Sequence, residues 1–410
     1  MATTRLVILI LTYLLIAVQQ VPMLRLNRPA AALLGAVAMV TIGGLPLREA
    51  YGAISADVMV FLLGVLLLTG FLEEGGFFEW AARFVVERAR SATALLAAVV
   101  VVSGLLSAFF VNDTVCLVLT PLLIAVLRPL GLPARPYLIA LALSANVGSA
   151  MTPTGNPQNM LIAVASGLTF ARFLAALALP SIGGLAIVFA VVRMLHRAEL
   201  SKPLAAAVKV PAEPFDGVLV AKSLVVFAAA LAGWLAGFSL PLVAITAAAV
   251  LVAIAKRDPA RAFAKVEWSL LLFFGALFVV MRGARDLPLV NDLTTAAAAH
   301  LNGAPLHDAA VTSAAMLALS NLISNVPAVI LWLPVVPAVA APSFVWLTIA
   351  MSSTFSGNLT LLGSMANLIV AERAEARGER LGFADYLRVG VPVTLLTMGW
   401  GIAALILVGR

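Results

Sequence analysis

One acidic residue, Asp113, lies inside a long apolar stretch of this 410-residue chain, between Asn112 and Thr114. A carboxylate among apolar residues costs free energy unless it exchanges a proton or binds a cation, so we expect ion chemistry here. The structural alternative is a hydrogen-bonded helix cap that never titrates. Cys116 follows on nearly the same helix face, where ordinary packing is favoured over contact with a soft metalloid, because stable capture needs several sulfurs.

A second polar triplet, Ser324-Asn325-Val326, also precedes an apolar run. The segment 106–121 superposes without a gap on 319–334, which puts Asn112 over Asn325 at an offset of 213. We expect the polar side chains at both tips to cap the helices that start there. Such a helix start also offers free amides and partial positive charge to a ligand. The tip candidates for substrate binding are Asn112, Asp113, Thr114, Ser324 and Asn325.

Two helix breaks form the other half of the predicted site. Residues 144–162 superpose on 352–370 at an offset of 208. Glycine and proline between 148 and 157 cannot continue a regular helix, so backbone groups there are free to bind. No Gly-Lys-Ser/Thr follows, which argues against a phosphate loop. The candidates in the breaks are Asn146, Thr152, Gly155, Asn156, Asn159, Ser356, Asn358, Thr360 and Gly363.

The composition places most of the chain in lipid. Hydrophobic residues make up 63% of the sequence and charged residues 11%, and runs such as 58–71 and 228–255 carry no charge. The net charge of +7 is not accompanied by basic and aromatic clusters, so nucleic acid is not an expected partner. A single cysteine and three histidines in predicted loops argue against a metal centre, and no cofactor is expected.

The repeats and apolar runs predict an all-α polytopic membrane protein of two inverted repeats, with about ten spanning helices, two re-entrant hairpins and two broken helices. The first repeat covers 1–200, with its hairpin at 92–130 and its broken helix at 136–168. A cytoplasmic linker follows at 201–215. The second repeat covers 216–410, with its hairpin at 309–341 and its broken helix at 344–371. We interpret 5–22 as the first span and not as a signal peptide, because no small-residue cleavage site follows it.

The distribution of basic residues sets the predicted orientation. This arrangement puts most of the 26 lysines and arginines, Arg28 among them, on one side of the membrane. The other side receives only Arg5, Arg48, Arg172, Arg282, Arg285 and Arg410. By the positive-inside rule, the chain lies in the inner membrane with both termini outside the cytoplasm.

The two blocks resemble the ion transporter superfamily, and within it the ArsB/NhaD-type permeases, over essentially the whole chain. Asn112-Asp113 with the later Leu119-Thr120-Pro121 is similar to a signature of arsenite permeases, and 152–159 is similar to their broken-helix motif. The resemblance implies a transporter, not an enzyme, and no nucleophile–base pair is visible in the sequence. Dicarboxylate carriers of this superfamily have Ser-Asn-Thr at both tips, whereas here Asp113 would repel a dianion unless it were neutralised.

We therefore expect a secondary antiporter that exports arsenite and antimonite, a small inorganic substrate, in exchange for protons, with Asp113 as the coupling acid. Sodium- or proton-coupled transport of a dicarboxylate or another anion, and sodium/proton exchange, stay open as alternatives. Two alternatives from a different class of protein also stay open. The chain could form a channel, or it could be the membrane subunit of a pump whose cytoplasmic ATPase docks on the basic loop 193–209.

Overall fold

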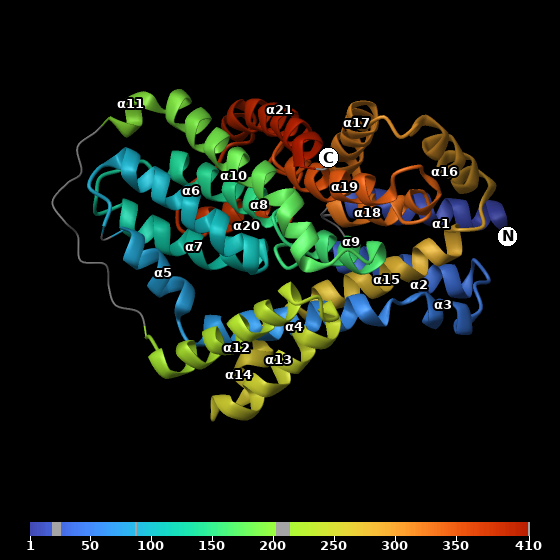
Figure 1. Ribbon diagram of the computed structural model, residues 1–410, viewed down its shortest axis with the longest axis horizontal. Helices are drawn as coiled ribbons and strands as arrows, with labels where there is room; N and C mark the ends of the chain where they lie inside the picture. The colour runs from blue at the N-terminus through green and yellow to red at the C-terminus, as the bar shows by residue number, and fades with distance from the viewer. Residues whose placement is uncertain (19–25, 87, 202–213, 409–410) are drawn as a thin grey trace.

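The computed structural model describes residues 1–18, 26–86, 88–201 and 214–408, and these ranges contain helices and no strand (Figure 1). The helices of the first half are α1 Ala2–Val18, α2 Arg28–Thr41, α3 Leu47–Ala53, α4 Ala56–Glu74, α5 Phe77–Val86, α6 Ala92–Phe109, α7 Asn112–Leu127, α8 Ala134–Ser149, α9 Pro157–Ser166, α10 Phe170–Leu195 and the short α11 Arg197–Leu200. Those of the second half are α12 Gly217–Leu235, α13 Leu240–Ala255, α14 Pro259–Ala264, α15 Trp268–Ala284, α16 Pro288–His300, α17 Pro305–Ile323, α18 Asn325–Trp332, the 3-10 turn Val336–Ala338, α19 Pro342–Ser356, α20 Met365–Glu375 and α21 Phe383–Val408.

The helices α12 to α21 repeat the order of α1 to α10, with similar lengths except that α18 has 8 residues where α7 has 16. A hairpin (α6 and α7, then α17 and α18) is followed each time by a broken helix (α8 and α9, then α19 and α20) and by a 26-residue helix. Six described helices, α4, α6, α10, α12, α17 and α21, are long and apolar enough to cross a membrane, and shorter apolar helices accompany them. The prediction of an all-α polytopic membrane protein is confirmed, while the limits and inversion of the repeats stay a prediction.

The helices form two lobes in Figure 1. The lower lobe contains α2 to α4 and α12 to α15, in which α2 packs on α15 and α4 packs on α13. The upper lobe contains both hairpins and both broken helices. In it α7 packs on α20 of the other half, and α18 correspondingly packs on α9. Through these contacts each hairpin packs against the broken helix of the other half.

The second arm of the second hairpin is too short to cross a bilayer. Helix α18 has 8 residues, which at 1.5 Å per residue is ~12 Å against the ~30 Å of a hydrocarbon core. This short helix fits the predicted re-entrant hairpin, and the return of the chain to its side of entry stays a prediction.

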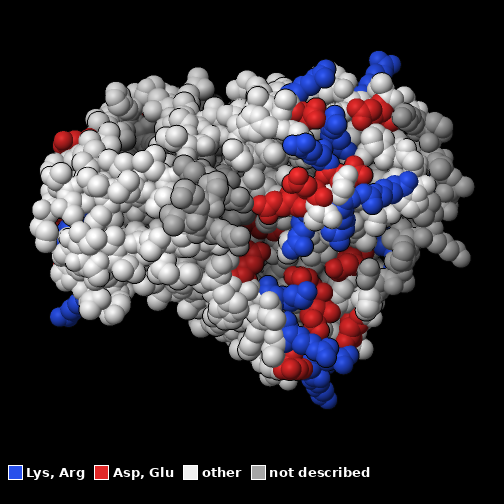
Figure 2. All heavy atoms as spheres, turned by 180° about the vertical axis from the view of Figure 1, so that it is seen from behind, with Lys and Arg blue, Asp and Glu red and all other residues white. Residues whose placement is uncertain are grey.

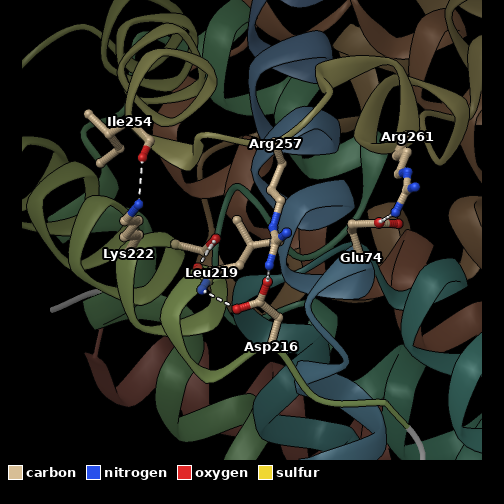
Figure 3. Close-up of polar contacts among 8 residues, drawn as sticks. Glu74, Asp216, Leu219, Lys222, Ile254, Arg257 and Arg261 are labelled. Atoms are coloured by element: carbon tan, nitrogen blue, oxygen red, sulfur yellow. Dashed lines mark hydrogen bonds and ion pairs between the residues drawn. The ribbon is translucent and has the colours of Figure 1, made fainter.

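The charged side chains gather over one end of the molecule, on the side where α5, α11, α12 and α14 lie in Figure 1, as Figure 2 shows from behind. At this end, Asp216 caps α12 by accepting the Leu219 N–H at 3.0 Å and pairs with Arg257 (Figure 3). The Leu219 amide, and then Arg257, hold the pKa of Asp216 below its usual range. Lys222 donates to the carbonyl of Ile254 at 2.7 Å, so α12 is held to α13 here and, through Arg257, to the turn that follows α13.

The structure departs from the sequence expectations for two histidines and for the capping of the tips, and it describes two predicted segments only in part. His300 ends α16 and His307 lies in α17, so two histidines predicted to be in loops are helical. Residues 19–22 of the first predicted span lie outside the described residues, as do 202–213 of the linker and of the proposed ATPase-docking loop. The predicted capping at the tips is wrong: no side chain caps α7 or α18, whose N-cap residues are Val111 and Ser324.

Candidate functional site

Both hairpin tips and both breaks line one small central cavity of about 100 Å³. The tips contribute Asn112, Asp113, Ser324, Asn325 and Val326, and the breaks contribute Pro157, Gln158, Ser364 and Met365. The lower lobe closes it with residues of α2 and the start of α15, namely Arg28, Pro29, Glu267, Ser269, Leu270 and Phe273. Four of the predicted tip residues are therefore brought together. Thr114 instead lines a neighbouring cavity, and Cys116 is buried in α7 away from the centre.

The polar side chains of the two tips do not cap α7 and α18, and they lie at the central cavity instead. The backbone N–H of Asn112 donates to the Gly155 carbonyl at 3.0 Å, which fixes the first tip against the first break. Its side-chain amide donates to Asn146 Oδ1 at 3.1 Å. The second tip turns at Ser324 with φ 78° and ψ 160°, a conformation nearly restricted to glycine and strained by roughly 1–3 kcal/mol in other residues.

Asn146 is the hub of the hydrogen bonds that join the two halves. Its Nδ2 donates to Asn358 Oδ1 at 2.8 Å and to Asn367 Oδ1 at 2.9 Å. Its Oδ1 accepts from Asn112 at 3.1 Å and from the Ser364 hydroxyl at 2.9 Å. A side-chain amide has two donor hydrogens and two acceptor sites, so all the capacity of Asn146 is used within the protein. This residue positions the site and has no bond left for a substrate.

Two asparagines hold the breaks in the same way. Asn159 Nδ2 donates to the carbonyls of Ser149 and Thr152, both at 3.1 Å. Asn367 Nδ2 donates to the carbonyls of Gly357 at 2.8 Å and Thr360 at 3.0 Å. Each acceptor pair lies at equivalent positions of the two superposed segments. These amides replace the helical hydrogen bonds lost at the breaks, as buried backbone requires.

The remaining predicted residues of the breaks make local contacts. Asn156 caps α9 by accepting the Asn159 N–H at 2.9 Å and also donates to Thr354 Oγ1 at 3.3 Å in the other half. Thr152 donates to the Ala108 carbonyl, and Thr360 donates to Asn321 Oδ1 at 3.2 Å. The Ser356 hydroxyl donates to the Ser352 carbonyl. Gly155 and Gly363 allow the backbones to approach closely, and a Cβ on Gly155 would lie 2.2 Å from the Ser149 carbonyl oxygen.

Two charged residues of the cavity were not predicted. Arg28, expected on the cytoplasmic side, is buried with 7% exposure at the start of α2, and its Nη1 donates to Ser324 Oγ at 3.3 Å. Glu267 precedes α15 and lies near enough to Asp113 for the two charges to act on each other. Asp113 is therefore not the only carboxylate at the centre. The burial of Arg28 has a signal in the sequence: Asn27-Arg28-Pro29, a cap followed by proline, starts an apolar helix of only 14 residues. No sequence signal singles out Glu267.

Three residues that line the central cavity, from both halves of the chain, carry unpaired polar atoms. The side-chain oxygens of Asn112 and Asn325, and Nε of Arg28, are buried and have no hydrogen-bond partner among the described residues. Buried polar groups normally have partners, so these atoms mark acceptors and a donor that a bound molecule would satisfy. The two asparagines occupy equivalent positions of the two hairpin tips.

Two larger cavities flank the central one. A cavity of about 640 Å³ at the charged end is lined by Glu267, Thr114 and the exposed Lys265 and Arg373. A cavity of about 740 Å³ lies at the other end, between α3, α15, α16 and α18. The Glu49 carboxylate and Arg282 form an ion pair of 2.7 Å in its wall. A small site between two larger cavities is an arrangement that suits the passage of a small molecule through the protein.

Comparison with known proteins gives a consistent result. Residues 13–354 match the family model described as citrate transporter. The chain is 32% identical over 458 residues to the silicon efflux transporter LSI3 of Oryza sativa subsp. japonica, covering 95% of this chain and 94% of that one. It is 25% identical over 502 residues to a transporter designated arsB of Dictyostelium discoideum, covering 94% and 88%. The crystal structure of the YdaH transporter of Alcanivorax borkumensis superposes with a TM-score of 0.62 at 17% identity, covering 98% of this chain and 96% of that one, which shows a shared fold.

Proposed function

Because the chain belongs to the citrate transporter family, within the ion transporter superfamily, we propose that this secondary transporter exports a small uncharged metalloid hydroxide, arsenite or antimonite, in exchange for protons. Asp113 is the coupling acid, and Asn112, Asn325 and Arg28 hold the substrate. The inverted repeats 1–200 and 216–410 carry it across the inner membrane, with both termini and the 740 Å³ cavity outside the cytoplasm. The asymmetric charge distribution in Figure 2 supports this orientation.

The observation that carries the proposal is the size and lining of the central cavity. About 100 Å³ is room for roughly three water-sized groups at ~30 Å³ each, far below the ~300–1,000 Å³ of drug-sized sites. The hydroxyls of arsenite can donate to the free oxygens of Asn112 and Asn325, and its oxygen can accept from Arg28 Nε. Each unpaired atom thereby gains a partner.

A polycarboxylate such as citrate fits this cavity poorly. Its carboxylates would meet Asp113 and Glu267, and Arg28 is the one cation among the described residues of the lining. Like charges in a low-dielectric cavity repel strongly. We therefore do not assign citrate as the substrate, although the family model is described by that name.

Silicic acid is the second candidate substrate. It is also a small uncharged hydroxide, and its hydroxyls can use the same oxygens of Asn112 and Asn325. The similarity to the rice silicon efflux transporter favours it. Both candidates require the same cavity chemistry, so direct measurement of the two fluxes separates them.

The test is flux into proteoliposomes with an imposed pH gradient, with arsenite, silicic acid and citrate measured separately. We expect arsenite or silicic acid to move with the gradient, and Asp113→Asn to slow that flux by about tenfold or more. The control is Glu375→Gln, which changes an exposed carboxylate on α20 and should leave the rate within about twofold. Citrate flux without flux of either hydroxide would overturn the substrate assignment, and an unchanged pH dependence in Asp113→Asn would remove that residue from coupling.

A further inference from the structure

Glu267 is shared by two cavities. It lines the central cavity together with Asp113, and it lines the 640 Å³ cavity at the charged end together with Glu73 and Lys265. The lining of this larger cavity includes the exposed side chains of Lys265, Arg373 and Arg377, so it reaches solvent. Glu267 therefore stands between the solvent at this end and the carboxylate at the centre.

Asp113 and Glu267 differ from the neighbouring carboxylates in having no fixed partner. Glu73 forms an ion pair with Lys265 at 2.9 Å, and Glu74 pairs with Arg261 at 3.7 Å (Figure 3). No hydrogen bond or ion pair within the described part of the chain engages the carboxylate of either Asp113 or Glu267. Arg28 is the cation that lines the same cavity, but a carboxylate that forms no ion pair and shares a small cavity with a second carboxylate is stabilised when one of the two carries a proton.

The charges around Glu267 come from both lobes. On the central side stand Asp113 of α7 and Arg28 of α2. On the solvent side stand Glu73 and Glu74 of α4, Glu79 of α5, Lys265, and Arg373 and Arg377 of α20. Charges of both signs line the larger cavity, so it holds water without strongly excluding a proton.

We propose that Glu267 relays protons between Asp113 and the 640 Å³ cavity, which the proposed orientation places on the cytoplasmic side. The inference rests on the proposed proton-coupled function and adds a second residue to it. After the centre has accepted a proton from outside, the proton leaves the carboxyl of Asp113, crosses water in the central cavity and binds the carboxylate of Glu267. Glu267 then releases it to water in the larger cavity. Asp113 is left ionised and ready for the next cycle, and Glu267 returns to its starting charge.

The relay is tested with Glu267→Gln in proteoliposomes, using whichever hydroxide the wild-type protein carries. Two rates are measured: net flux driven by a pH gradient, over a range of pH, and exchange of labelled for unlabelled substrate at equal pH. Exchange needs no net proton release, so the variant should keep it within about twofold while losing about tenfold or more of the net flux and changing its pH profile. The matched control is Glu74→Gln, which removes a carboxylate of the same cavity that is already paired, and it should retain both rates.

Every other outcome overturns either the relay or the proposed function. Net flux and a pH profile equal to the wild type would overturn the relay while leaving the proposed transport intact. Loss of exchange together with net flux would also overturn it, because Glu267 would then serve binding or folding. A wild-type protein that exchanges neither arsenite nor silicic acid would instead reject the proposed function, and with it the relay.

Discussion

Arg28 Nη1 lies 3.3 Å from the hydroxyl oxygen of Ser324, so the first residue of α2 contacts the tip of the second hairpin. This contact joins the lower lobe to the upper lobe at the central cavity, which both residues line. A buried guanidinium beside two carboxylates also reduces their mutual repulsion. Any movement of the hairpin relative to the lower lobe must break this hydrogen bond or carry Arg28 with it.

Replacement of Arg28 should therefore impair transport strongly. Arg28→Ala leaves Asp113 and Glu267 without the guanidinium of the cavity, and we expect initial rates of substrate flux to fall by about tenfold or more. Arg28→Lys keeps the charge but loses the planar set of donors, so its rate should lie between those of Arg28→Ala and the wild type. The control is Arg172→Ala, an exposed arginine at the start of α10, for which little change is expected. Equal rates in Arg28→Ala and the wild type would show that this contact is dispensable.

Asn146→Ala should destabilise the protein more than any other change to a single polar side chain of the breaks. It leaves Asn112, Ser364, Asn358 and Asn367 each without one buried partner, and an unsatisfied buried group costs about 1–3 kcal/mol. We expect a loss of at least ~4 kcal/mol of unfolding free energy, measured as a large fall in the thermal unfolding midpoint in detergent. Ser144→Ala is the matched control, because the Ser144 hydroxyl, among the described residues, donates to the Ala140 carbonyl of its own helix alone. Similar midpoints for the two variants would contradict the assignment of Asn146 as the hub.

The sequence was sufficient to predict the hairpins and breaks, because proline, glycine and polar residues interrupt apolar runs at equivalent places in both halves. It also located Asn112, Asp113 and Asn325 at the centre. It misplaced Arg28, since an arginine beside a predicted helix end is indistinguishable from a solvated one until the packing of that helix is known. The depth of α2 depends on its contact with α15, far away along the chain. The capping prediction failed for a related reason: Asn112 and Ser324 form tertiary hydrogen bonds, with Asn146 and Arg28, that compete with the local amides.

Gly155→Ala should prevent correct assembly of the first break. The added Cβ would lie 2.2 Å from the Ser149 carbonyl oxygen and 2.7 Å from that of Ser107, and both atoms belong to backbone that cannot rotate away. Overpacking of this kind costs about 1–3 kcal/mol where neighbours adjust, and more where they cannot. We expect little folded protein by size-exclusion chromatography. Gly275→Ala, where a Cβ would meet no atom within 4 Å, is the control and should fold normally; a well-folded Gly155→Ala protein would contradict the close approach.

Asp216 makes a pH-dependent contribution to stability at the charged end. The Leu219 N–H and Arg257 lower its pKa in the folded protein, so the folded state holds this proton less tightly than the unfolded state does. The contribution of Asp216 to stability is therefore fully present above its unfolded-state pKa of about 3.9, and it is lost as the pH falls through the lower pKa of the folded state. The Asp216 side chain is 25% exposed and its partner Arg257 is 59% exposed, and an ion pair at the surface contributes about 1 kcal/mol or less. Asp216→Asn should lower the unfolding midpoint by roughly 2 °C or less at neutral pH, and the difference from the wild type should shrink under acidic conditions. A difference that stays constant or grows as the pH falls would show that Asp216 acts through its shape and not through its charge.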